Sequence, residues 1–183
     1  SCELTVEAVS NLLLGASVDF YLAMNLDGIS TLNDLAGGVT VTLEDDFSEI
    51  DPAMTKGATL TLQGDQAETF VRSRMAVGDG TNESRMKRQE EFLSQLAAQL
   101  GQKVRASEQF TADLYDELLP YLVTDMARGR IINEVWNARD YTLEPTLELT
   151  GEHKTADDGF TEFYPDAGSV EQAVLELFWE PVE

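Results

Sequence analysis

The chain has 183 residues, with 34 Asp and Glu against 12 Lys and Arg, and a formal net charge of −22. This length suits one domain with a substantial core, and a single domain over residues 1–183 is predicted. So acidic a chain is not expected to bind nucleic acid over a broad face or to contact a membrane through a polybasic surface. One cysteine, Cys2, and one histidine, His153, exclude a Cys/His zinc site.

Hydrophobic periodicity and turn residues predict helices and strands in mixed order along the first half of the chain. The expected elements are helix 4–14, strand 18–24, helix 26–35, strands 39–43 and 58–62, helix 65–74 and a long helix over 83–100. The acidic stretch between the two alternating strands is predicted to be a surface loop, since it lacks the ligand spacing of an EF-hand.

The second half is predicted to continue in the same way, with no run of 18 apolar residues. The expected elements are helices 107–123 and 126–138, strands 141–144 and 146–149, a polar loop at 151–159, strand 160–164 and helix 170–178, with Ser169 as its N-cap. The predicted fold class is α/β: a mixed β-sheet flanked by helices on both sides, in three α-β-α layers, with strands 39–43 and 58–62 as neighbours.

Basic residues concentrate in one 17-residue window, and none occurs before Lys56. The five are Arg72, Arg74, Arg85, Lys87 and Arg88. A helix-loop-helix turn through the glycine-rich segment 77–82 would bring its arginines together beside a helix N-terminus, where an anion is favoured. The alternative, left open by the residues alone, is a solvated helix whose arginines pair with Glu83, Glu90 and Glu91.

The order and spacing of several segments resemble the LytR-CpsA-Psr family of bacterial cell-envelope proteins. The segments are ASVDFYLAMNLDGISTLNDLAGGVTVTLEDDF, LTLQGDQAETFVRSR, SRMKRQEEFL and GFTEFYPDAGSVEQAVLELF. The resemblance implies an LCP-like catalytic domain of a membrane-anchored protein on the outer face of the cytoplasmic membrane. Such a protein would transfer an anionic glycopolymer from a polyprenyl-pyrophosphate carrier to peptidoglycan with the help of Mg²⁺. The family's older label is transcriptional attenuator, which this chemistry does not support.

The same resemblance implies roles for the basic loop and its flanks. Arg72 and Arg74 match the family's Arg-x-Arg, and Arg85, Arg88 and Gln89 match its Arg-x-x-Arg-Gln. These five residues are expected to bind the pyrophosphate, with Arg85 also catalytic. Where the family usually has an acidic residue, three positions before Arg85, this chain has Asn82, so Asn82 and the nearby Asp79 are the candidates for the remaining catalytic and metal-binding roles.

Several alternatives stay open. The family's domain begins with further strands that carry Asp and Arg, so this chain is expected to cover its C-terminal two thirds, either as an active phosphotransferase or as an inactive fragment. A fragment of this kind is expected to be marginally stable or to self-associate. The alternative function is a non-catalytic envelope module that binds polyprenyl phosphates or polyanions, whereas a DNA-binding regulator is disfavoured by the charge.

Apolar residues are candidates for a lipid pocket, although an ordinary core role is favoured for each. They are Phe20, Leu22, Leu96, Leu100, Leu119 and Ile131. Trp136 and Trp179 are predicted to be packing anchors, and His153 to be a solvated surface residue.

Overall fold

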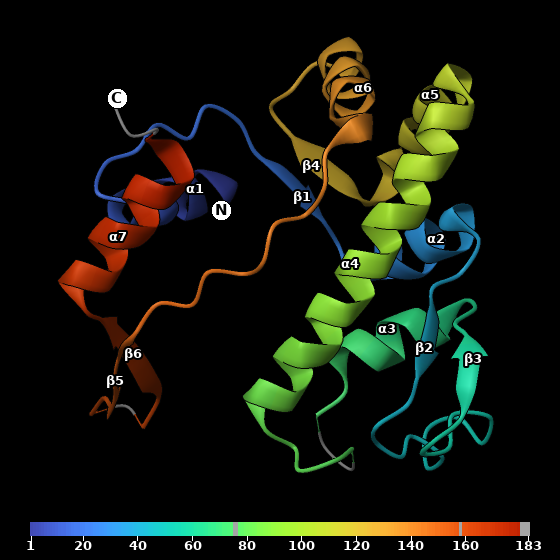
Figure 1. Cartoon of the computed structure of the whole chain (residues 1–183), viewed down its shortest axis with the longest axis horizontal. Helices are drawn as coiled ribbons and strands as arrows, with labels where there is room; N and C mark the ends of the chain where they lie inside the picture. Colours follow the sequence, from blue (N-terminus) through green and yellow to red (C-terminus); the bar gives the residue numbers. More distant parts are fainter. Residues whose placement is uncertain (75–76, 158, 180–183) are drawn as a thin grey trace. The chain divides into compact units, whose positions relative to one another are not determined.

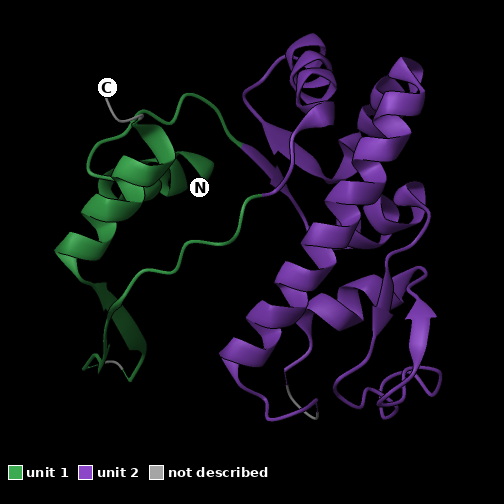
Figure 2. Ribbon diagram, in the orientation of Figure 1, with its two compact units in different colours: residues 1–21, 144–183 green, residues 22–143 purple. Residues whose placement is uncertain are grey.

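The computed structural model describes residues 1–74, 77–157 and 159–179 of the chain. Contacts divide it into two compact units, one formed by Ser1–Tyr21 with Glu144–Glu183 and the other by Leu22–Leu143 (Figure 2). The prediction of a single domain stays a prediction, and the two units are therefore taken separately. Across the described ranges, no helix combines the length and the apolar character needed to cross a membrane.

The larger unit contains most of the secondary structure, and its long helix α4 packs against α2, α3 and α5 (Figure 1). Its elements are β1 (Leu22–Met24), α2 (Asp27–Ala36), β2 (Thr40–Thr42), β3 (Thr59–Thr61), α3 (Asp65–Arg72), α4 (Asn82–Ala106), α5 (Glu108–Leu118), η1 (Leu119–Tyr121), β4 (Leu122–Thr124), α6 (Arg128–Asn137) and η2 (Ala138–Asp140). β1 pairs with β4 and β2 pairs with β3, both antiparallel.

The β2–β3 hairpin shows why alternating sequence forms half-buried strands. Val41 is buried opposite the half-buried Leu60, while the threonines on the other face pair through their hydroxyls, Thr40 with Thr61 and Thr42 with Thr59, each at 2.8 Å. The buried face joins a core supplied by α2, α3 and α4. Its members are Ala36, Val39, Val41, Leu43, Phe47, Met54, Leu62, Ala67, Phe70, Val71, Val77, Phe92 and Leu96.

The fully buried Asn33 ties α2 to this hairpin. Its amide donates to the Leu62 carbonyl at 2.8 Å, and its Oδ1 accepts from the Val39 backbone N–H at 2.9 Å. The chain can turn from α2 into β2 because Gly37 and Gly38 have φ values of 102° and 85°, which favour glycine. A Cβ on Gly38 would also lie 2.5 Å from Thr61 Cγ2, so glycine is required there for two reasons.

The described residues of the smaller unit form α1 (Cys2–Leu12), β5 (Gly151–Thr155), β6 (Thr161–Pro165) and α7 (Ala167–Phe178). β5 and β6 form an antiparallel hairpin in which His153 pairs with Phe163 across the strands. Its core is small, since Val170 and Val174 are the buried apolar side chains among its described residues.

The α/β fold class is confirmed, and so is the predicted pairing of the strands around 39–43 and 58–62. The described strands, however, form three separate two-stranded antiparallel sheets, where one mixed sheet was expected. The three-residue ladders of β1–β4 and β2–β3 do not adjoin one another in hydrogen bonding.

Several predicted boundaries were wrong. Residues 141–150 are not strand: Pro145 lacks a backbone N–H, and Tyr141 and Leu143 are 80% and 65% exposed, so neither packs on a sheet face. The predicted polar loop at 151–159 begins instead with β5, because β6 satisfies its backbone groups.

Two predicted helices also differ. The predicted helix 107–123 stops before Pro120, after which residues 122–124 form β4. Ser169 lies inside α7, and its hydroxyl accepts from the Thr150 N–H.

Candidate functional site

The site is built around the N-terminus of α4, where the glycine-rich loop turns into the helix. Thr81 is the N-cap, and its hydroxyl accepts from the Ser84 N–H at 3.2 Å. Asp79 stabilises the same turn, since its Oδ1 accepts from the Thr81 N–H at 2.9 Å and from the hydroxyls of Thr81 and Ser84 at 2.8 Å each. This Asp-Thr-Ser arrangement begins α4 at a defined residue.

These hydrogen bonds lower the pKa of Asp79 to about 2; the Thr81 N–H contributes most, followed by the hydroxyls of Ser84 and Thr81. Asp79 is therefore a carboxylate at neutral pH and a weak base. A general base needs a pKa near the working pH, so this geometry favours a structural role for Asp79 over proton transfer.

Two of the predicted arginines meet at Asn82, the first residue of α4. Arg74 Nη2 donates to Asn82 Oδ1 at 3.0 Å, and Arg85 Nη2 donates to the same oxygen at 2.6 Å. The Asn82 amide nitrogen faces Met86 Sδ at 3.4 Å. Two guanidiniums thus share one neutral acceptor, and Arg85 Nε is buried with no hydrogen-bond partner in the described parts of the chain. Arg74, Arg85 and Asn82 are called the arginine site below.

Arg88 has a different position, because it is 8% exposed and packs into the core. Its Nη1 donates to Asp45 Oδ2 at 3.0 Å, and its Nη2 donates to the Ser73 carbonyl. Its guanidinium lies 5.3 Å from the centre of the Phe47 ring. Arg88 is therefore buried and paired with an acidic side chain, whereas the sequence predicted an arginine that binds pyrophosphate.

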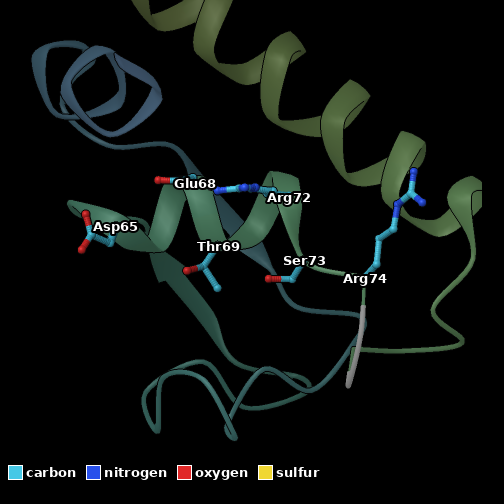
Figure 3. A pocket seen from close by; sticks show the side chains of 6 residues that line it. All are labelled: Asp65, Glu68, Thr69, Arg72, Ser73 and Arg74. Atoms are coloured by element: carbon cyan, nitrogen blue, oxygen red, sulfur yellow. Dashed lines mark hydrogen bonds and ion pairs between the residues drawn. The ribbon is translucent and has the colours of Figure 1, made fainter. Parts of the chain in front are cut away.

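Arg72 also turns away from the arginine site. Its Nη1 forms an ion pair with Glu68 Oε1 at 2.6 Å along α3. An open depression of about 530 Å³ lies on this side of α3, and Figure 3 shows Arg72 directed along α3 toward Glu68 while Arg74 extends beside α4. The residues that line it are Asp65, Glu68, Thr69, Arg72, Ser73 and Arg74.

The prediction that the four arginines converge was therefore only partly correct. Arg74 and Arg85 meet at Asn82, as predicted for two members of the set, while Arg72 and Arg88 pair with acidic side chains. Those acids are Glu68 and Asp45, whereas the alternative left open by the sequence named Glu83, Glu90 and Glu91. Glu83 forms an ion pair with Lys87 at 3.0 Å. Glu68 could have been found from its four-residue spacing, but nothing in the sequence singled out Asp45.

An apolar cavity of about 220 Å³ lies next to Gln89. The residues that line it are Met24, Ile29, Leu32, Val71, Gln89, Phe92, Leu93 and Leu96. Of the predicted pocket residues only Leu96 lines this cavity. Ile131 is buried, Leu100 is half-buried along a separate groove, and Phe20, Leu22 and Leu119 are 38%, 49% and 51% exposed.

The residues expected to hold a magnesium ion do not fit one as they are arranged. Asn82 Oδ1 faces two guanidiniums, which repel a cation, and Asp79 Oδ1 already accepts three hydrogen bonds. In the part of the chain that the structure describes, no three His, Cys, Asp or Glu side chains gather in a way that could hold a metal ion. Mg²⁺ stays a prediction.

Several solved structures have the same fold as this chain. The chain matches Bacillus subtilis TagV with a TM-score of 0.70 and 23% identity, covering 98% of this chain and 71% of that one. It matches TagT bound to LI-WTA with a TM-score of 0.73 and 21% identity, covering 96% and 65%. It matches a transcriptional regulator of Enterococcus faecalis with a TM-score of 0.74 and 20% identity, covering 96% and 63%.

Sequence comparison gives the family. Biofilm regulatory protein A of Streptococcus mutans is 34% identical over an alignment of 91 residues, and the match covers 46% of this chain and 22% of that protein's length. The family model for LytR-CpsA-Psr proteins matches residues 2–177, nearly the whole sequence. The chain belongs to the LytR-CpsA-Psr family.

Proposed function

We propose that this chain binds a polyprenyl-pyrophosphate-linked glycopolymer and serves its transfer to peptidoglycan in the cell envelope. Family membership supports a role in envelope glycopolymer transfer, and TagT, a protein of the same fold, has been solved bound to LI-WTA. The acidic glycopolymer and the peptidoglycan acceptor, the outward-facing location and a membrane anchor in the parent protein belong to the same proposal.

One observation carries it: a single face of α4 runs from charged to apolar. Arg85, Gln89 and Leu93 are spaced four residues apart and so follow one another along the helix surface. Arg85 belongs to the arginine site, Gln89 lines the apolar cavity, and Leu93 lines it one turn further on. A ligand with an anionic head and an apolar tail matches this order, as a prenyl pyrophosphate does.

The chemistry of this site is electrostatic. Arginine forks donate charge-assisted hydrogen bonds to phosphate oxygens, and phosphoryl transfer depends chiefly on positioning and on neutralising charge. Arg85 Nε has no hydrogen-bond partner among the described residues, so it is a donor that a phosphate oxygen could satisfy once the buried side chain turns toward the ligand. The Asn82 oxygen is a neutral acceptor, and an anionic phosphate oxygen would form stronger hydrogen bonds to the same two arginines in its place.

Geranylgeranyl pyrophosphate titrated by calorimetry tests the proposal. Arg85→Ala should weaken binding by roughly 10- to 100-fold, since hydrogen bonds to charged groups contribute about 1.5–3 kcal/mol. Arg128→Ala is the matched control: it removes the same charge from an exposed arginine that pairs with Asp116 on α5. Equal affinity in the wild type and Arg85→Ala would contradict the arginine site as the place where the pyrophosphate binds.

A second function is favoured by a specific observation. The described residues hold no ready metal donor set, and Asp79 is too weak a base for proton transfer. A non-catalytic module that binds polyprenyl phosphates would need neither. Transfer of a labelled glycopolymer to peptidoglycan by this chain, with and without Mg²⁺, separates the two functions: binding without transfer favours the module.

A further inference from the structure

Arg88 requires a counterion because its charged group is buried. Its side chain is 9% exposed, and its ion-pair partner Asp45, at 3.0 Å, is 21% exposed. The Phe47 ring lies 5.3 Å from the guanidinium centre. A buried cation without a partner is strongly destabilising, so Asp45 is what permits an arginine at this position.

Asp45 also contacts the glycine-rich loop. Gly78 has a φ of 56°, and a Cβ built on it would lie 2.5 Å from Asp45 Oδ1. The absence of a side chain at Gly78 therefore lets the carboxylate lie directly against the loop. The stretch after β2 therefore contacts, through Asp45, both the loop before α4 and α4 itself.

Arg88 connects Asp45 to the C-terminal end of α3. Arg88 donates to the Ser73 carbonyl, and the neighbouring Gln89 donates to the Val71 carbonyl at 3.0 Å. The last carbonyls of a helix lack partners within it, so these two donors satisfy groups that would otherwise be unpaired. The held carbonyls lie on either side of Arg72, and Ser73 immediately precedes Arg74.

We propose that Asp45 is a positioning residue of the arginine site: it orients Arg88, which holds Ser73 and so places Arg74 beside Arg85 at Asn82. Arg88 acts through the backbone and does not contact the ligand. This inference rests on the proposed function for the ligand's identity, but the arrangement of the arginines can be tested without any ligand.

The experiment compares Asp45→Ala, Asp45→Asn and a matched core variant, Val104→Ala, which removes a buried side chain near the opposite end of α4. The probe is geranylgeranyl pyrophosphate, titrated at a temperature where each variant is folded. Asp45→Ala should lose at least about tenfold in affinity, the scale of one disturbed charge-assisted hydrogen bond. Asp45→Asn, which keeps an acceptor for Arg88, should lose less, and Val104→Ala should bind like the wild type.

A second readout separates positioning from general destabilisation. The Arg85 Nε–H is buried, so its NMR signal reports the geometry of the arginine site in the free protein. It should shift in Asp45→Ala and keep its wild-type position in Val104→Ala. If Asp45→Ala does not fold, Asp45→Asn and Gly78→Ala provide the same comparison, since a Cβ at Gly78 displaces the carboxylate.

The outcomes are distinct. An unshifted Arg85 signal in the Asp45 variants overturns the positioning role. The same holds if Asp45→Ala binds geranylgeranyl pyrophosphate as tightly as the wild type does. If the wild type does not bind the lipid while the Arg85 signal still shifts in Asp45→Ala, the proposed function fails and the positioning role stands. Equal losses in Asp45→Ala and Val104→Ala would assign the effect to stability alone.

Discussion

At the scale of single residues, Asp79 shows how a predicted catalytic side chain can instead shape a loop. Its carboxylate accepts three hydrogen bonds from Thr81 and Ser84 within one turn. Asn82, the other member of that prediction, is the acceptor shared by Arg74 and Arg85. A carboxylate in its place would cancel one of the two positive charges, whereas the neutral amide leaves both available for an anion.

The pKa of Asp79 gives the first prediction. Because folding lowers it from 3.8 to about 2, the carboxylate stabilises the loop fully above its unfolded-state pKa, and that stabilisation is lost as pH falls from about 4 through about 2. Ser84→Ala removes one hydroxyl donor and should raise the pKa toward its ordinary value. A ¹³C NMR titration of the Asp79 carboxyl measures both proteins; an ordinary pKa in the wild type would contradict the loop geometry.

At the scale of elements, α4 connects the two halves of the candidate site. Its N-terminal turn carries Asn82 and Arg85, while Phe92 and Leu96 enter the core. Arg85 and Arg88, three residues apart, differ by about 60° around the helix axis. That rotation directs Arg88 to Asp45 and leaves Arg85 at Asn82, so neighbouring residues of one helix have different tasks.

The apolar part of the α4 face gives the second prediction. Leu93 is 56% exposed and lines the cavity beside Gln89. Leu93→Ser should weaken the binding of geranylgeranyl pyrophosphate by roughly tenfold, since each CH₂ removed from contact costs about 0.8 kcal/mol. The binding of inorganic pyrophosphate, which has no apolar tail, should not change. Leu175→Ser is the control, because Leu175 is 53% exposed on α7. Calorimetry with both ligands decides; equal losses for both would contradict a separate tail site.

At the scale of the whole molecule, the two compact units differ in how much apolar surface they bury. The larger unit contains the contiguous core around Phe47, Phe70 and Leu43, whereas the described part of the smaller one buries only Val170 and Val174 among its apolar side chains. Large apolar side chains stay exposed in the smaller unit, among them Leu4, Leu14, Phe160, Phe178 and Trp179. The expected self-association stays a prediction.

This difference gives the third prediction. Amides of β5, β6 and α7 should exchange with solvent faster than those of β2 and α4, because local opening is easiest where few apolar contacts are broken. Hydrogen exchange followed by mass spectrometry resolves the two units within one sample. Phe70→Ala, a substitution in the larger core, should accelerate exchange in α3 and α4 and leave β5 and β6 unchanged. Uniform protection across both units would contradict the prediction.

Much of the larger unit was determined by the sequence alone, because its signals are local. The alternation around Val41 and Leu60 formed the β2–β3 hairpin, and the two glycines after α2 ended that helix, as expected. The basic window also predicted that Arg74 and Arg85 lie close together, as they do at Asn82. β5 could not be predicted from its polar residues, since the strand depends on backbone pairing with β6.

The individual roles of the arginines were decided only by the tertiary structure. Arg88 belongs to the same sequence pattern as Arg85, yet it is buried because Asp45, 43 residues earlier in the chain, supplies its counterion. No periodicity or spacing connects residues so far apart. The sequence alone determined that positive charge gathers at the start of α4; folding decided which of those charges is neutralised inside the protein and which can reach a ligand, because burying a charge requires a partner that only the fold brings near.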